Sequence, residues 1–121
     1  MILPLTLENA SYLANGRELL SDLSLTLSAG TRTVVLGANG AGKSSFLRLC
    51  HGLIKPTSGI VKWHASENTR RHQAFVFQRP VLLRRSALAN LVFALRANGV
   101  ARSRHKELAE KALLQVGLID Q

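Results

Sequence analysis

The sequence has few acidic residues, few aromatic residues and a single cysteine, and each shortage narrows what the chain can be. Seven Asp and Glu stand against 16 Lys and Arg, so the formal charge is +9. This charge favours nucleic acid, an anionic membrane surface or a phosphate-bearing ligand as the partner. The single cysteine, Cys50, excludes an internal disulfide and a cysteine-based zinc site. Aromatic residues make up only 5%, and the sequence pattern of a known nucleic-acid-binding module is absent. We therefore expect no nucleic-acid partner.

Long apolar runs are also missing, although apolar residues are plentiful. Nothing approaches the roughly 18 consecutive apolar residues that a membrane-spanning helix needs. The first residues, MILPLTLENASY, lack the basic region of a signal peptide, so we do not expect a leader there. Hydrophobic residues still make up 46% of the 121 residues, which is enough for the packed core of one ordinary domain.

Short apolar runs, several of them alternating, predict strands in the first two thirds of the chain. The predicted strands are 3–7, 23–27, 33–36, 60–63 and 74–77. Asn15-Gly16 is a strong turn signal between the first two. The polar stretch 66–72 is expected to be a loop.

Three stretches have the spacing of amphipathic helices. The first places Phe46, Leu49, Cys50 and Leu53 on one face and ends near Gly52 and Pro56. The second spans 86–97, with Ser86 as its N-cap. The third spans about 103–116, with its inward face formed by Leu108, Ala112, Leu113 and Val116.

A glycine-rich loop lies between the predicted strand 33–36 and the first helix. Gly37-Ala38-Asn39-Gly40-Ala41-Gly42-Lys43-Ser44 matches G-x-x-x-x-G-K-[ST] at every fixed position. Glycines let successive backbone N–H groups point at phosphate oxygens, and the following helix adds its partial positive charge. Lys43 would reach the β- and γ-phosphates, and the Ser44 hydroxyl would ligate Mg²⁺. The predicted nucleotide-binding residues of this loop are Gly37, Asn39, Gly40, Ala41, Gly42, Lys43, Ser44 and Ser45.

On these residues the chain resembles the N-terminal portion of an ABC-transporter ATPase. The resemblance extends over LLSDLSLTLSAGTRTVVLGANGAGKSSFLRLCHGLIKPTSGIV and the later FVFQRP. It implies an α/β fold: an incomplete P-loop NTPase core with an N-terminal antiparallel β subdomain and the start of a helical subdomain. The whole chain, 1–121, is then a partial ATPase domain. We expect the β subdomain at 1–32, the P-loop core up to the Q-loop at 33–80 and the start of the helical subdomain at 81–121.

The resemblance also implies ATP and Mg²⁺ as cofactors and adds two residues to the site. Gln78 corresponds to the family's Q-loop glutamine, which ligates Mg²⁺ or its water and senses the γ-phosphate; its amide oxygen is a neutral ligand suited to this. Tyr12 is the candidate for stacking on adenine. It lies two residues further upstream of the loop than the family's usual position, where this sequence has Ala14.

Several motifs of the family are missing from these 121 residues. We find no LSGGQ signature, no acidic strand carrying the Mg²⁺-linked Asp and the catalytic Glu, and no switch His, so no catalytic residue is identified. Glu107 and Glu110 lie on a predicted solvated helix face and follow no apolar strand. His51 and His105 are expected on the surface of helices.

The resemblance implies the ATP-binding portion of an ATPase that powers transport through transmembrane permease subunits. A second ATPase copy would complete an ATP-bound dimer at the inner, cytoplasmic face of the cell membrane. The stretch FQRPVLLRRSALANLVFAL is most similar to importers of oxyanions such as tungstate and phosphate. Two alternatives remain open: a nucleotide-binding fragment without turnover, and a basic nucleic-acid-binding domain. The arginine-rich part after residue 70 is either solvated surface or a contact with a membrane partner.

Overall fold

The computed structural model describes residues 1–65 and 68–118, and the chain forms two compact units. The first unit, Met1–Phe75, holds the sheet and one α-helix, and the second, Val76–Gln121, holds two α-helices. The elements of the first unit are β1 (Leu5–Ala14), β2 (Arg17–Leu27), α1 (Lys43–His51), β3 (Ser58–Trp63) and the 3₁₀ turn η1 (Thr69–His72). Those of the second are α2 (Ala87–Ala97), the 3₁₀ turn η2 (Arg102–Arg104) and α3 (His105–Gln115).

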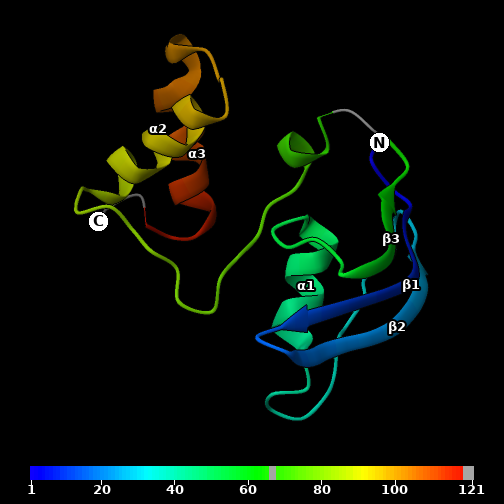
Figure 1. The fold of residues 1–121 in the computed structure, drawn as a ribbon. Coiled ribbons are helices and arrows are strands. Elements are labelled where there is room, and N and C mark those ends of the chain that lie inside the picture. The colour runs from blue at the N-terminus through cyan, green and yellow to red at the C-terminus, as the bar shows by residue number, and fades with distance from the viewer. Residues whose placement is uncertain (66–67, 119–121) are drawn as a thin grey trace. The chain divides into compact units, whose positions relative to one another are not determined.

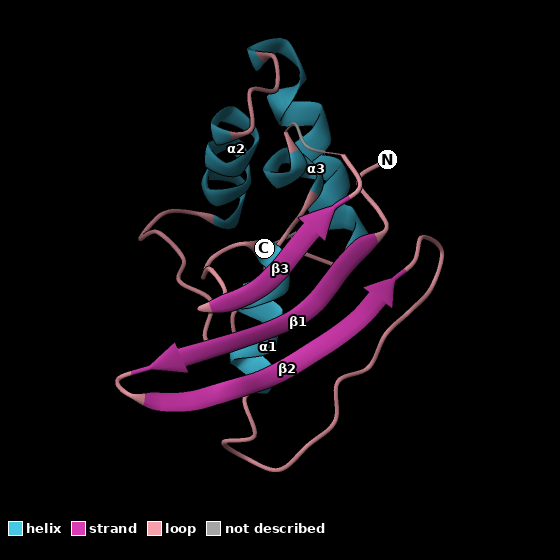
Figure 2. Ribbon diagram, turned by 45° about the vertical axis from the view of Figure 1, so that its right-hand side comes forward, coloured by secondary structure: helices cyan, strands magenta, loops and turns pink. Residues whose placement is uncertain are grey.

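The three strands form one antiparallel sheet in the order β2-β1-β3. Asn15 and Gly16, both with positive φ (52° and 74°), make the tight turn between β1 and β2, as the sequence predicts. Leu7 of β1 lies opposite Leu25 of β2 and Val61 of β3, so one face of all three strands is apolar. This apolar face is the one that α1 covers (Figures 1 and 2).

An irregularity bends β1 near its middle, where the register shifts on both sides of Ala10. Asn9 takes a positive φ of 45°, and its side-chain Nδ2 donates to Asp22 Oδ1 at 2.7 Å. The Asp22 N–H in turn donates to Ser11 Oγ at 2.9 Å. Gly59 of β3 lies against this bulge, where a Cβ would collide with the carbonyl of Asn9. The bulge is therefore held by side chains and by a glycine that allows β3 to approach.

The core of the first unit lies between the sheet and α1. Its buried members come from β1, β2 and α1: Leu5, Leu7, Ala10, Leu20, Phe46, Leu49 and Cys50. The spacing of Phe46, Leu49 and Cys50 is the helical spacing that predicts this face. Leu53 was expected on the same face, but α1 ends at His51, Gly52 caps it with a φ of 82°, and Leu53 is half exposed.

The second unit is a pair of packed helices. Ser86 caps α2 as predicted, because its Oγ accepts a hydrogen bond from the Ala89 N–H at 3.1 Å. Ala109 and Leu113 of α3 are buried. Val116, expected on the inward face, is the C-cap of α3 and is 66% exposed, so that expectation is wrong.

Two predicted strands do not form. Residues 33–36 and 74–77 belong to no β-ladder among residues 1–65 and 68–118. Their apolar and β-branched residues favour extended backbone, but neither segment is a strand of the β2-β1-β3 sheet. As a result Val34, Leu36 and Val76 are each more than 70% exposed.

The two histidines expected at the surface are partly or wholly enclosed. His105 is only 8% exposed, and its Nε2 lies 2.7 Å from the Val100 carbonyl oxygen, which ties η2 and α3 to the end of the loop before them. The ring of His51 is in edge contact with Phe75 at 5.5 Å between centroids, and its Nδ1 is buried. The expectation is wrong for His105, which is buried, whereas His51 is partly exposed and packs one ring edge against Phe75.

Candidate phosphate-binding site

The glycine-rich loop joins the extended segment 33–36 to α1. Gly40 and Gly42 have positive φ values of 79° and 94°, and the Ala41 N–H donates to the Ala38 carbonyl at 3.1 Å to close a turn. A Cβ at position 42 would lie 2.6 Å from the Leu19 carbonyl oxygen. Glycine is therefore required at position 42 by its left-handed backbone and by the close approach of β2.

The N-terminus of α1 points its unpaired N–H groups at the space in front of this loop. No side chain caps the helix at Gly42, and no acidic residue occupies its first turn. The first intrahelical bond runs from the Phe46 N–H to the Gly42 carbonyl at 2.8 Å, so Lys43, Ser44 and Ser45 precede it. A helix start with these properties attracts an anion through its donors and its dipole.

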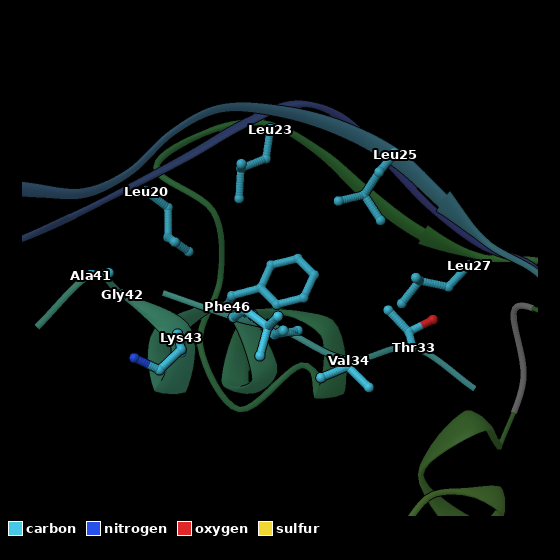
Figure 3. A pocket seen from close by; sticks show the side chains of 12 residues that line it. Leu20, Leu23, Leu25, Leu27, Thr33, Val34, Ala41, Gly42, Lys43 and Phe46 are labelled. Atoms are coloured by element: carbon cyan, nitrogen blue, oxygen red, sulfur yellow. The ribbon is translucent and has the colours of Figure 1, made fainter. Parts of the chain in front are cut away.

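Lys43 folds back over the loop that precedes it. Its Nζ donates to the carbonyl oxygens of Gly37 at 2.6 Å and Ala38 at 2.7 Å. In Figure 3 the nitrogen points away from the leucines of β2. An ammonium has three donors, so one remains for a ligand while the other two hold the loop closed. The arrangement places one positive charge beside the turn and the helix start.

The donor set suits a phosphate and a Mg²⁺ bound to it. Ser44 is exposed on the first turn of α1, and its hydroxyl is the hard oxygen ligand that Mg²⁺ prefers. Within residues 1–65 and 68–118, no group of three or more His, Cys, Asp and Glu could hold a metal ion. Mg²⁺ usually takes only one or two protein ligands beside phosphate oxygens and waters, so one serine hydroxyl is compatible with it.

Tyr12 lies on β1 opposite Leu20 of β2 and packs, half-buried, against the core. The Leu20 side chain also approaches Gly42, since a Cβ there would lie 3.1 Å from Leu20 Cδ2. The strand pair that carries Tyr12 therefore supports the end of the loop. Stacking of adenine on Tyr12 stays a prediction.

Gln78 is exposed and belongs to the second unit, three residues after the first unit ends. Its predicted contact with Mg²⁺ and the γ-phosphate stays a prediction.

The residue that organises the segment after Gln78 is Asn90, which the sequence did not point out. The amide of Asn90 donates to the carbonyls of Leu83, Arg85 and Ser86 at 3.0–3.2 Å, and its Oδ1 accepts from the Leu83 N–H at 3.0 Å. The sequence signal that could have indicated this role is the position of Asn90 one helical turn after the N-cap Ser86.

Cys50 is not part of the chemistry of this site. Burial raises the pKa of its thiol to about 11, well above neutral pH. The thiol is therefore protonated and poorly nucleophilic, and Cys50 acts as a small apolar residue of the core.

An extended apolar segment, a glycine loop and an uncapped helix start carrying Lys and Ser define a P-loop NTPase core, here with an antiparallel β subdomain at its N-terminal side. Comparison with known proteins then identifies the family. A family model described as ABC transporter matches residues 20–121, and the chain belongs to this family. In the described residues, no helix combines the length and the apolar character that a membrane crossing needs.

Curated relatives are ATP-binding proteins of transport systems and are longer than this chain. An Fe(3+) ions import ATP-binding protein of Rhizobium meliloti is 38% identical over 80% of this chain and 29% of its own length. A taurine import ATP-binding protein of Chromobacterium violaceum is 38% identical over 90% of the chain and 43% of its own length. An ergothioneine transport ATP-binding protein of Helicobacter pylori is 31% identical over 93% and 56%. The chain thus spans between 29% and 56% of the length of these relatives.

Solved structures show the same fold. The structure of an ATP-binding subunit of an ABC transporter matches 98% of this chain with a TM-score of 0.79 and 23% identity, and the chain covers 52% of it. A bacterial Atm1-family ABC exporter with ATP bound matches 98% of the chain with a TM-score of 0.78 and 24% identity.

Proposed function

We propose that the chain is the phosphate-binding part of an ATPase that drives import through separate transmembrane subunits. The observation that carries the proposal is the loop 37–44, in which Gly40 and Gly42 turn the backbone, α1 begins without a cap, and Lys43 lies across the turn. This constellation supplies donors and positive charge at one place, which is what a triphosphate needs.

The roles of the residues follow from their positions. The N–H groups of residues 40–45 donate to phosphate oxygens, and Lys43 adds a charge-assisted hydrogen bond. Ser44 would hold Mg²⁺ through its hydroxyl, and Tyr12 would stack on the adenine. By its correspondence to the family's Q-loop glutamine, Gln78 would supply a neutral oxygen ligand for Mg²⁺. When it is bound, Mg²⁺ neutralises phosphate charge. No carboxylate in the sequence follows an apolar strand as a general base, so hydrolysis depends on further polypeptide.

Transport, partners and location rest on the relatives. Several are named for import. In our proposal the import runs through permease subunits at the inner face of the cell membrane. We place this chain there, with a second ATPase copy as the other partner. The cargoes in the relatives' names are Fe(3+), taurine and ergothioneine. An oxyanion of the tungstate or phosphate type is our finer proposal, based on the resemblance of residues 77–95.

A non-hydrolysing nucleotide-binding fragment is the second candidate. The chain covers only 52% of a solved ATP-binding subunit, so that subunit contains much polypeptide with no counterpart here. The glycine loop, the start of α1 and Lys43 all belong to the first unit, so we propose that phosphate binding by this unit does not need hydrolysis. A basic nucleic-acid-binding domain has only the charge of +9 in its favour.

Competition binding tests the proposal on the full 121-residue chain. A fluorescent ATP analogue is displaced, in the presence of Mg²⁺, by ATP, by AMP, by adenosine or by single-stranded DNA. Each charge-assisted hydrogen bond is worth about 1.5–3 kcal/mol, and the phosphates of ATP would accept several of them. ATP should therefore bind at least about a hundredfold more tightly than adenosine, which lacks phosphates. Equal displacement by ATP and adenosine would contradict phosphate binding, and displacement by DNA at lower concentration than ATP would support the nucleic-acid alternative.

A further inference from the structure

The chain contains three Asn-Gly pairs, at 15–16, 39–40 and 98–99. In such a pair the backbone nitrogen of the glycine can attack the side-chain Cγ of the asparagine, because glycine has no Cβ to hinder the approach. The new N–Cγ bond closes a five-membered succinimide, and the Cγ–Nδ2 bond breaks, so the amide nitrogen leaves as ammonia with the glycine proton. Water then opens the ring to aspartate or isoaspartate. The reaction consumes one water, releases one ammonia and needs no other reagent.

The pair at 98–99 is held on both sides of this reaction. Asn98 Nδ2 donates to the Ala94 carbonyl at 2.9 Å, and the Gly99 N–H donates to the Arg96 carbonyl at 3.0 Å. The side-chain amide and the attacking nitrogen are thus both fixed to the end of α2. Both hydrogen bonds must break before the ring can close.

The pair at 15–16 is held by its hairpin. Ala14 lies opposite Arg17 in the ladder between β1 and β2, and Asn15 and Gly16 both have positive φ, as in a type I′ turn. In that turn the glycine nitrogen lies nearly opposite the asparagine Cβ about the Cα–C bond, whereas the succinimide needs these two atoms on the same side. Ring closure would therefore have to open the turn of a paired hairpin.

The pair at 39–40 lacks these restraints. Asn39 is exposed, and within residues 1–65 and 68–118 neither its side-chain amide nor the Gly40 N–H makes a hydrogen bond. The turn around the pair is closed by one hydrogen bond, from the Ala41 N–H to the Ala38 carbonyl. The nucleophile and the amide that it attacks are therefore both available.

The surroundings of Asn39 also favour the attack electrostatically. When the glycine nitrogen adds to Cγ, negative charge develops on the side-chain oxygen, and nearby positive charge stabilises it. Lys43 Nζ lies 2.7 Å from the carbonyl oxygen of Ala38, the residue before Asn39. The helix α1 begins just after the loop, with no acidic residue in its first turn, and adds the positive end of its dipole. The features that suit this loop to an anion thus also suit it to the attack on Asn39.

We propose that Asn39 is a site of spontaneous deamidation that switches off phosphate binding in the nucleotide-free chain. The product is a carboxylate in the loop 37–44, where Lys43 can pair with it in place of a phosphate and where it repels phosphate oxygens. Isoaspartate in addition lengthens the backbone of the turn by one methylene group. The modified loop therefore binds phosphate more weakly than the original one.

Bound nucleotide should in turn protect Asn39, and this part rests on the proposed function. The N–H groups of residues 40–45 are assigned there to phosphate oxygens, so the attacking nitrogen of Gly40 is engaged while ATP is bound. Deamidation is thus expected in the empty site and suppressed in the occupied one.

Peptide mass spectrometry of the full 121-residue chain tests the chemistry. The chain is incubated at mildly alkaline pH without nucleotide, and conversion to aspartate and isoaspartate is followed at all three asparagines. We expect Asn39 to convert fastest and Asn98 at least about tenfold more slowly, because two hydrogen bonds must first open there. In urea the three pairs should convert at similar rates, since the fold no longer distinguishes them. Conversion at Asn39 no faster than at Asn15 or Asn98, or a ranking that persists in urea, would overturn the proposal.

Nucleotide titration tests the consequence. Asn39→Asp reproduces the charge of the product and should weaken ATP binding at least about tenfold, because a carboxylate then faces the phosphates. Asn15→Asp is the matched control, since it adds the same charge at an exposed Asn-Gly turn of the same unit, and it should bind ATP like the wild type. In the aged wild-type chain, the loss of ATP binding should follow the conversion of Asn39, which checks the effect without any substitution.

Protection by ATP separates this proposal from the proposed function. Saturating ATP with Mg²⁺ should slow conversion at Asn39 and leave conversion at Asn98 unchanged. ATP affinity unchanged in Asn39→Asp, or Asn39 unprotected while ATP is bound, would overturn the switch. If the fresh wild-type chain binds no ATP, the proposed function is wrong and the switch with it, whereas the ranking of the three asparagines is measured without nucleotide and is decided independently.

Discussion

Lys43 stabilises the loop and offers its charge to a ligand at the same time. Its two hydrogen bonds to the Gly37 and Ala38 carbonyls hold the ammonium beside the turn, so little side-chain entropy is left to lose when a phosphate arrives. The third donor is available at once, and the others can be exchanged for phosphate oxygens. In the proposed function, Lys43 therefore holds the loop in the shape that would bind the phosphate.

Tyr12 has a packing role and a proposed binding role, and suitable variants separate them. If adenine stacks on the ring, Tyr12→Ala should weaken ATP and AMP alike by about 1–3 kcal/mol, the scale of base stacking on an aromatic ring. Tyr12→Phe should be nearly silent. Because Tyr12 also packs against the core, Tyr12→Leu serves as the control that keeps apolar contact but removes the flat ring.

The measurement is equilibrium binding of each nucleotide to each variant. Stacking predicts that Leu and Ala are similarly weak and that Phe resembles the wild type. A Tyr12→Leu chain that binds as tightly as the wild type would contradict stacking. A Tyr12→Phe chain as weak as Tyr12→Ala would assign the effect to the hydroxyl.

At the scale of elements, α2 fixes the segment that follows Gln78, the candidate Q-loop glutamine. Asn90, in the first turn of the helix, makes four hydrogen bonds to the backbone of residues 83–86. Arg85 in addition lies over the Phe93 ring at 5.5 Å. The segment that follows Gln78 therefore ends in a hydrogen-bonded anchor at residues 83–86.

This anchor is tested by the exchange rate of one amide. Asn90→Ala removes the acceptor of the Leu83 N–H, so we expect that amide to exchange with solvent at least tenfold faster. Asn98→Ala is the control, since Asn98 Nδ2 donates only to Ala94 in its own helix. Unchanged exchange at Leu83 in Asn90→Ala, measured by NMR, would show that the segment is held by something else.

The sequence predicts an element correctly when neighbouring residues determine its structure. The prediction fails when residues far away in the sequence determine it. The Asn15-Gly16 turn, the Ser86 cap and the buried face of α1 follow from single residues and short spacings. The prediction of a strand at 33–36 was wrong. A strand forms only beside a hydrogen-bonded partner, and these residues pair with no strand among residues 1–65 and 68–118.

The candidate site divides in the same way. The glycines and Lys43 of the candidate site can be predicted from the sequence, because the motif reflects the local backbone conformation of the loop. The approach of Leu19 to Gly42, which makes the glycine indispensable, depends on how β2 packs on the loop and has no sequence signal. The burial of His105 depends on the Val100 carbonyl, which the fold brings to its ring.

At the scale of the whole molecule, the glycine loop 37–44 and an apolar cavity beside it both lie in the first unit. The loop 37–44 has its turn, its helix and its lysine within the first unit. Beside it, the leucines of β2 and the segment 33–36 border a cavity. The proposed phosphate binding therefore depends on residues of the first unit.

The central claim is that the loop binds ATP through its phosphates, and calorimetric titration of Lys43→Ala tests it most directly. Lys43→Ala should weaken ATP binding by about 1.5–3 kcal/mol, the value of a charge-assisted hydrogen bond, which is roughly 10- to 150-fold. Lys55→Ala is the matched control, since it removes the same charge from an exposed position of the same unit. We predict that Lys55→Ala and wild type bind ATP alike and that adenosine binding is unchanged in both variants. Equal affinity of Lys43→Ala and wild type for ATP would contradict the account.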